Sequence, residues 1–171
     1  MNAINKIENL EEWSPEKFID FDVISENWYI YELEDKTIIR FKTVLTAIYD
    51  AVPAESETAV DGLRKAFFNM RLLSSVFSPK DIREKKGKVW SILELEKNIA
   101  HRNLMFRQLK DAGFAEYETA KSKLQIKTIL KQVDKTSKFD ALGNPAYIIR
   151  TENEVFVERK QILQEQTKSE E

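Results

Sequence analysis

Residues 91–113 have the sequence SILELEKNIAHRNLMFRQLKDAG, and this stretch decides which fold class the sequence predicts. Ser91 and Glu94 have the Ser-x-x-Glu spacing of a capping box, which marks a helix start. Gly113 stands where a left-handed C-cap residue ends a helix. The stretch therefore predicts a helix that begins after Ser91 and ends at Gly113.

Apolar residues within this stretch recur at the spacing of an amphipathic helix: Ile92, Leu95, Ile99, Phe106 and Leu109. Arg102 interrupts the stripe at one expected apolar position, and Trp90 with Leu95 occupies the two positions of a hydrophobic staple. We expect the apolar stripe of this helix to pack against β structure or against a partner chain.

The chain before this stretch predicts a β-hairpin. Residues 28–33 and 37–49 are rich in β-branched and aromatic residues, and residues 34–36 form a polar, turn-sized break between them. In the second arm, apolar and basic residues alternate: Ile39, Phe41 and then Thr43 against Arg40 and Lys42. One face of the hairpin should therefore be buried and the other solvated.

The chain after this stretch is β-rich again. Residues 123–133 alternate between apolar and polar side chains, and residues 146–150 and 154–157 are strand-like. Between them, residues 140–145 predict a turn, because Gly143 accepts positive φ and an asparagine before a proline stays out of the helix.

The two β segments have local similarities that suggest an internal duplication. Residues 41–45 align with 126–130 at an offset of 85, and residues 70–77 align with 149–156 at an offset of 79. Chance similarity between two β segments is the alternative. Apolar spacing alone leaves residues 58–77 open between helix and strand, and the duplication favours a strand over 66–77.

These elements predict an α+β fold. It comprises two β-rich units, either small barrels or one shared antiparallel sheet, separated by the long amphipathic helix and preceded by short N-terminal helices. The predicted boundaries are a helical lead-in at 1–22, a first β unit with its connection at 23–88, the linking helix at 89–113, a second β unit at 114–160 and a polar tail at 161–171.

The composition is that of a folding chain without covalent or metal staples. Of 171 residues, 42% are hydrophobic and 11% aromatic, which is too apolar for a disordered protein. The chain has no cysteine, which excludes disulfides, thiolate metal sites and cysteine nucleophiles and suits a cytoplasmic protein. No apolar run approaches the ~18 residues of a membrane span, and the N-terminus does not resemble a signal peptide.

Charge is distributed unevenly along the chain. Residues 1–35 carry 2 basic and 10 acidic side chains, residues 36–150 carry 22 and 13, and residues 151–171 carry 3 and 6. The basic middle either offers a surface to an acidic partner or is neutralised by the acidic ends folding back over it. An acidic isoelectric point near 5.7 favours neutralisation.

The residues exclude several kinds of active site. His101 is the only histidine, so a two-histidine metal site cannot form, and we expect it to be structural. The four glycines lie far apart, which excludes phosphate-binding loops and dinucleotide fingerprints. The acidic clusters at 32–35 and 116–118 lack the spacing of a calcium loop and are typical of solvated turns.

A basic stretch is the strongest candidate for contact with a partner or a polyanion. Its candidate residues are Lys80, Arg83, Lys85, Lys86, Lys88 and Trp90. Solvated linker lysines are the simpler interpretation, with Trp90 acting as a helix staple. The aromatic residues Trp28, Tyr29 and Tyr31 are a second possible platform, although aromatic strands more often belong to a core.

The function predicted from the sequence is a non-enzymatic protein-interaction or structural subunit of a larger assembly, with no cofactor and no metal. It implies a protein partner or self-association. A nucleic-acid-binding protein that uses the basic middle region is the alternative. An enzyme that relies on Asp, Glu and Lys chemistry is the second alternative, which no motif indicates.

Overall fold

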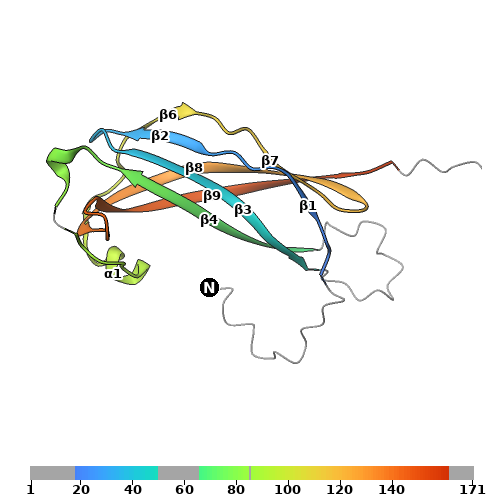
Figure 1. Ribbon diagram of the computed structural model, residues 1–171, viewed down its shortest axis with the longest axis horizontal. Coiled ribbons are helices and arrows are strands. Elements are labelled where there is room, and N and C mark those ends of the chain that lie inside the picture. Colours follow the sequence, from blue (N-terminus) through green and yellow to red (C-terminus); the bar gives the residue numbers. More distant parts are fainter. Residues whose placement is uncertain (1–17, 50–65, 85, 162–171) are drawn as a thin grey trace, which may run out of the picture.

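The computed structural model describes residues 18–49, 66–84 and 86–161, which form two antiparallel sheets (Figure 1). The first sheet has the order β4 (Phe67–Phe77), β3 (Ile38–Tyr49), β2 (Tyr29–Leu33) and β6 (Phe106–Lys110). The second has the order β1 (Asp22–Ser25), β7 (Ala115–Glu118), β8 (Ser122–Phe139) and β9 (Pro145–Arg159), and β5 (Ile99–His101) also pairs with β8. The predicted α+β class is therefore wrong, because the described chain is almost entirely β.

The long helix predicted over 91–113 is absent. One short helix, α1 (Ile92–Glu96), is followed by β5, which pairs with the end of β8, and by β6, which pairs with β2. Each short strand has its own partner in a sheet, and these long-range pairings override the local helical spacing. His101 consequently lies in β5, exposed, rather than in a helix.

The predicted helix start at Ser91 is nevertheless confirmed, whereas the predicted helix end at Gly113 is wrong. The Ser91 hydroxyl accepts from the Glu94 N–H at 3.2 Å, and the Glu94 carboxylate accepts from the Ser91 N–H at 2.9 Å, so the capping box forms. The helix ends where the Asn98 side chain donates to the Glu94 carbonyl at 2.7 Å. Gly113 has the predicted positive φ, +68°, but it lies in a loop before β7.

The predicted strands and turns flanking this region are confirmed. The hairpin of β2 and β3 forms, and β3 alternates between buried and half-buried residues along most of its length. Residues 67–77 are a strand, β4, which settles the ambiguity there in favour of β structure. The turn from β8 to β9 closes on the Asp140 carboxylate, which accepts from the N–H groups of Leu142 and Asn144 at 2.8 and 2.9 Å.

Some predictions fall outside the described residues. These are residues 1–17 of the helical lead-in, the polar tail at 162–171, residues 58–65 and Lys85. Within the described end of the lead-in, Phe18 forms an antiparallel bridge with Tyr49, and β1 starts at Asp22.

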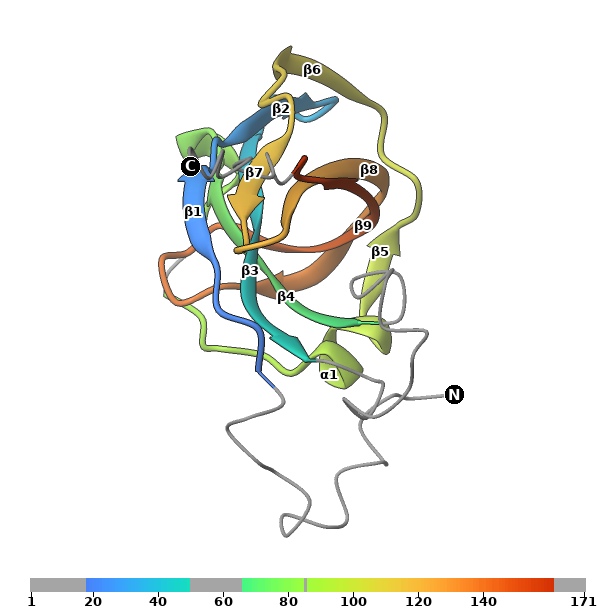
Figure 2. The ribbon, with the colours of Figure 1, turned by 90° about the vertical axis from the view of Figure 1, so that its right-hand side faces the viewer.

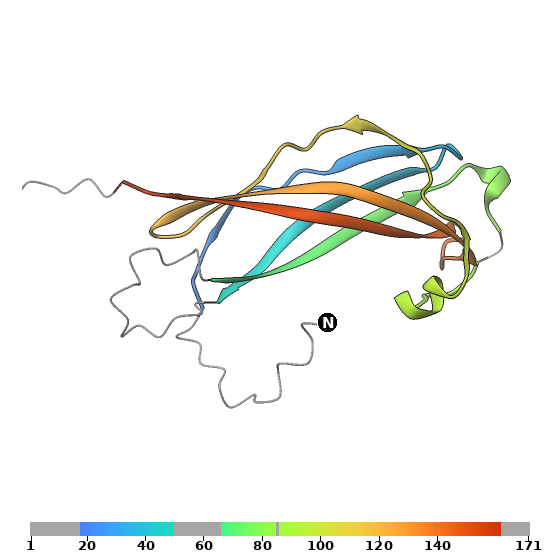
Figure 3. The ribbon, with the colours of Figure 1, turned by 180° about the vertical axis from the view of Figure 1, so that it is seen from behind.

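The two sheets have corresponding strand orders, β4-β3-β2 and β9-β8-β7. Register shifts fall between Leu45 and Ala47 in β3 and between Leu130 and Gln132 in β8, again 85 residues apart. The β units are not separate, because β6 completes the first sheet and β1 the second. Seen along the long axis, β8 and β9 curve strongly (Figure 2), and from behind they run together along the molecule (Figure 3).

The core between the sheets contains two hydrophobic clusters. One includes Tyr29, Tyr31 and Phe41 from the first sheet and Leu130 and Val133 from the second. The other includes Leu45, Ile48, Tyr117, Leu124 and Ile126. The aromatic residues Tyr29 and Tyr31 are therefore core residues and no ligand platform.

Candidate interaction surfaces

The predicted basic segment, residues 80–88, is attached to the turn between β8 and β9. It begins with a single 3-10 turn at Lys80–Ile82. Three backbone N–H groups in and before it donate to the turn: Ser78 to the Asn144 side chain (3.1 Å), Glu84 to the Gly143 carbonyl (3.0 Å) and Gly87 to the Asp140 carbonyl (2.9 Å). The segment is thus held on the second sheet at the end of the molecule where this turn lies.

Gly87 is required at the closest point of this contact. A Cβ atom added there would lie 1.9 Å from the carbonyl oxygen of Phe139 and 2.6 Å from its carbon. Both atoms belong to the backbone, so no side-chain rotation relieves the overlap. The glycine therefore determines how closely the basic segment approaches β8.

The charged side chains of the segment project into solvent. Lys80, Arg83, Lys86 and Lys88 are exposed, and Lys85 lies outside the described residues. The Arg83 Nε donates to the Ser78 carbonyl at 2.7 Å, which directs that side chain back along the chain. Lys80 and Lys86 are thus accessible, whereas Lys88 also forms an ion pair with Glu94 at 3.7 Å.

Trp90 is half-buried, and its indole is already engaged by the protein. Its Nε1 donates to the Phe139 carbonyl at 2.8 Å. The ammonium groups of Lys88 and Lys138 lie 4.1 and 5.0 Å from the ring centroid. Because two ammonium groups already lie within cation–π distance of the ring, Trp90 positions these lysines and is not a free surface on which a base could stack. Sequence reasoning missed Lys138, because it comes from β8, far along the chain.

A similar arrangement lies on the outer face of the first sheet. The Arg40 guanidinium and the Lys42 ammonium lie 4.1 and 5.4 Å from the centroid of the Trp28 ring. Lys42 also forms an ion pair with Glu26 at 3.1 Å. The Nε of Arg40 is buried and has no hydrogen-bond partner.

Among the described residues, the group that most resembles an active site is a polar cluster beside the β2–β3 turn. Asp35 accepts from Lys135 Nζ at 2.8 Å and from the Tyr147 hydroxyl at 2.6 Å. Burial alone would raise the pKa of the Asp35 carboxyl, but the hydrogen bonds from Lys135, Tyr147 and Thr37 outweigh it and lower this pKa. Burial and the contact with Asp35 raise the pKa of Tyr147. These shifts favour the carboxylate form of Asp35 and the neutral hydroxyl of Tyr147.

Two further polar groups are buried in the second sheet. Asp134 is fully buried and accepts from the Asn103 N–H at 2.9 Å and from the Gln132 amide at 2.8 Å. Burial raises its pKa, but these hydrogen bonds and the nearby arginines reverse that effect and lower it. The Tyr117 hydroxyl donates to Glu26 at 2.7 Å, and burial followed by this bond raises the pKa of Tyr117.

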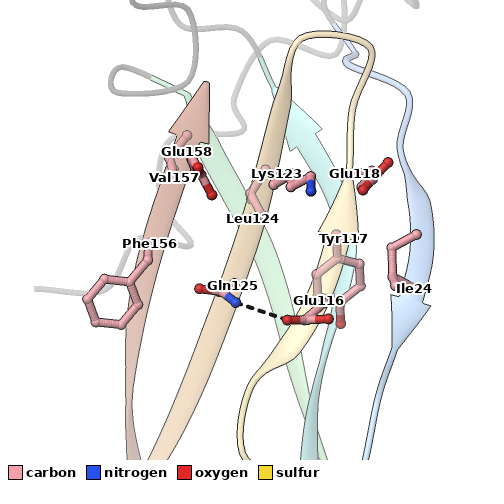
Figure 4. Close-up of a pocket in the computed structure, with 10 residues that line it drawn as sticks. All are labelled: Ile24, Glu116, Tyr117, Glu118, Lys123, Leu124, Gln125, Phe156, Val157 and Glu158. Carbon is pink, nitrogen blue, oxygen red and sulfur yellow. Dashed lines mark hydrogen bonds between the residues drawn. The ribbon is translucent and has the colours of Figure 1, made fainter. Parts of the chain in front are cut away.

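A shallow hollow of about 390 Å³ opens on the outer face of the second sheet (Figure 4). Ile24, Phe156 and Val157 supply its apolar lining, and the Gln125 amide spans to Glu116 at 2.9 Å. Glu118, also in the lining, pairs with Lys160 at 3.1 Å. No group of three or more potential metal ligands occurs among the described residues.

One exposed apolar surface follows β4, at the edge of the first sheet. Phe67, Leu72, Leu73 and Phe77 are 68%, 36%, 43% and 50% exposed. Among the described residues, β3 is the strand that pairs with β4. The sequence did not predict this surface, because its apolar spacing left residues 58–77 open between helix and strand. The position of a strand at the edge of a sheet also cannot be read from the strand's own residues.

The chain matches no protein-family model, no curated protein and no solved structure. None of the helices in the described ranges has the length and apolar character needed to cross a membrane.

Proposed function

We propose that this protein is a non-enzymatic interaction module, a structural subunit of a larger assembly. The observation that carries the proposal is the apolar edge strand β4, with four large side chains exposed along eleven residues. A strand edge offers unpaired N–H and C=O groups to another chain. The exposed apolar side chains lie on both faces of this strand, since Leu73 is opposite Lys42 and Leu72 is opposite the buried Thr43. The cysteine-free sequence suits assembly in the cytoplasm.

The polar clusters of the described residues support this proposal. Asp35, Lys135 and Tyr147 hydrogen-bond within the chain, and the carboxylate of Asp134 does the same. Because these polar groups are already hydrogen-bonded within the chain, they hold the strands in register and have few donors or acceptors left to bind a substrate.

Light scattering on the purified full chain, combined with mass spectrometry of co-purifying proteins, tests the proposal. We expect a particle larger than the 20.0 kDa chain, formed with itself or with a partner. A stable monomer at high concentration that recovers no partner from its native cell would contradict it.

A second candidate function is polyanion binding by the basic segment. The specific observation in its favour is that Lys88 and Lys138, from distant parts of the chain, meet at Trp90 within a patch of exposed basic residues. Binding to a labelled single-stranded oligonucleotide should weaken steeply as salt rises. The Lys88→Ala/Lys138→Ala variant should lose this binding, and Lys123→Ala, on the outer face of the second sheet, should keep it. No binding by the wild type at low salt would exclude this candidate.

A further inference from the structure

We propose that β4 pairs antiparallel with β4 of a second copy, about a two-fold axis at Leu72, so that two first sheets join into one continuous sheet. This inference rests on the proposed interaction module and names its partner. It starts from the position of β4, which is paired with β3 from Phe67 to Phe77 and is the terminal strand of its sheet. The other side of β4 is therefore the side on which another strand can add.

The edge at β4 lacks the protection that the corresponding edge has. Proteins protect edge strands with charged residues, prolines or very short strands. β9 occupies the matching position in the second sheet and carries five charged residues: Arg150, Glu152, Glu154, Glu158 and Arg159. β4 carries one, Arg71, and no proline over eleven residues. At the remaining edges, β6 carries Arg107 and Lys110, and β1 is only four residues long.

The sequence of β4, FFNMRLLSSVF, is close to self-complementary in antiparallel pairing. With Leu72 opposite its own copy, Phe67 meets Phe77 at each end of the strand. The intervening pairs are Phe68 with Val76, Asn69 with Ser75, Met70 with Ser74 and Arg71 with Leu73. Three of these pairings, including Leu72 with its own copy, bring apolar residues together and one brings polar residues together, whereas Met70 with Ser74 and Arg71 with Leu73 are mixed, so the single arginine meets leucine rather than its own copy.

The exposed side chains lie where this pairing would cover them. Leu73 and Arg71 lie opposite Lys42 and Val44 of β3, on the outer face of the sheet. The exposed fractions of Phe67 and Phe77 add up to more than one whole phenylalanine side chain. This is about 200 Å² of apolar surface in each copy. A standard interface buries about 800 Å² per partner, so the aromatic pairs supply roughly a quarter and the main-chain pairing must add the rest. We therefore expect a reversible dimer with a Kd on the order of micromolar.

Single cysteines test the two-fold axis directly, because the chain has no cysteine of its own. Cα atoms opposite one another in antiparallel strands lie about 4.5–5.5 Å apart, within disulfide range. Leu72→Cys should therefore form a disulfide-linked dimer rapidly under mild oxidation. Phe67→Cys alone should not, since its two copies would lie roughly 33 Å apart. An equimolar mixture of Phe67→Cys and Phe77→Cys should form the mixed dimer.

Leu142→Cys is the matched control for accidental collisions, since Leu142 is 77% exposed and lies in the β8–β9 turn. Cross-linking at residue 72 no faster than at residue 142 would overturn the inference. If light scattering still gives a multi-chain particle in that case, the interaction module stands but uses another surface. A monomeric wild type without a partner would contradict both.

A pair of charge variants tests the register independently. Leu73→Lys places a lysine opposite Arg71 of the second copy and should weaken dimerisation about tenfold, whereas Leu73→Glu places a carboxylate there and should not weaken it. If the two substitutions act only by removing an apolar contact, both variants should dissociate equally. That result would overturn the register. Because Lys42 neighbours Leu73 in β3, thermal unfolding of each variant should confirm that the chain remains folded.

Discussion

Thr43 and Thr128, which are 85 residues apart in the chain, share a hydrogen bond of 2.8 Å between their hydroxyl groups where the two sheets face each other. Both hydroxyls also lie within hydrogen-bonding distance of the side-chain oxygen Oδ1 of Asn153, at 3.1 and 2.9 Å. Along β3, Thr43 falls between Phe41 of one hydrophobic cluster and Leu45 of the other. The contact therefore forms a polar layer that separates two apolar halves of the core.

Replacement of these threonines by valine should reveal their coupling. Thr43→Val keeps the shape but leaves the half-buried side chain of Asn153 with one hydrogen bond fewer, at a cost of about 1–2 kcal/mol of unfolding free energy. Thr128→Val should cost a similar amount. The double variant should lose less unfolding free energy than the two single variants lose together, by about 0.5 kcal/mol or more, because both changes remove the same contact. Urea unfolding measures all three, and strict additivity would show that the layer is not one unit.

Asp35 should contribute to stability at neutral pH and not in acid. Its pKa is lower in the folded state than in the unfolded chain, so its contribution is complete above the unfolded value of about 4. The contribution is lost as the pH falls through the lower folded value. Asp35→Asn should be less stable by about 1–3 kcal/mol at pH 7 and should lose less stability than the wild type between pH 5 and pH 2.

The control for this pH profile is Glu154→Gln, whose side chain is exposed in β9. Its unfolding free energy should follow that of the wild type across the same range. If the unfolding free energy of Asp35→Asn changes with pH in the same way as that of the wild type from pH 7 to pH 2, the proposed role of the Lys135 and Tyr147 contacts is contradicted.

Gly87→Ala should release the basic segment from the β8–β9 turn. The added Cβ overlaps the Phe139 carbonyl, so the segment must move away from β8. Trypsin should then cleave after Lys86 or Lys88 several times faster than in the wild type, while the unfolding of the sheets changes little. Leu142→Ala, an exposed change in the neighbouring turn, should leave the cleavage rate unaltered; equal rates in all three proteins would argue against a fixed segment.

Tyr117→Phe should destabilise the second cluster without creating a cavity. The hydroxyl donates to Glu26 and accepts from the Leu45 N–H at 3.1 Å, so its removal leaves a buried donor without a partner. We expect a loss of about 1.5–3 kcal/mol in unfolding free energy, measured by urea titration. A change below about 0.5 kcal/mol would mean that water replaces the hydroxyl.

The sequence predicted the parts of this fold that local chemistry determines. The β2–β3 hairpin, the turn at Asp140 and the capping box at Ser91 each depend on residues within a few positions of one another. The offset of 85 between residues 41–45 and 126–130 also reappears as matching register shifts in β3 and β8. Local turn signals and strand alternation carried this information.

The remaining features depend on contacts between distant residues. The apolar spacing over 91–113 resembles a helix, yet Ile99 pairs with Thr136 and Phe106 with Leu33, and no local pattern contains those partners. The Asp35–Lys135 ion pair joins residues 100 positions apart. The exposure of β4 likewise depends on its being the last strand of a sheet, which its own sequence does not specify.

Multi-angle light scattering of the wild-type chain across a hundredfold concentration range tests the central claim most directly. We expect the mass to rise from that of the 20.0 kDa chain toward twice that value as concentration increases through the micromolar range. A mass that stays at one chain up to millimolar concentration, in a preparation that recovers no partner, would contradict it.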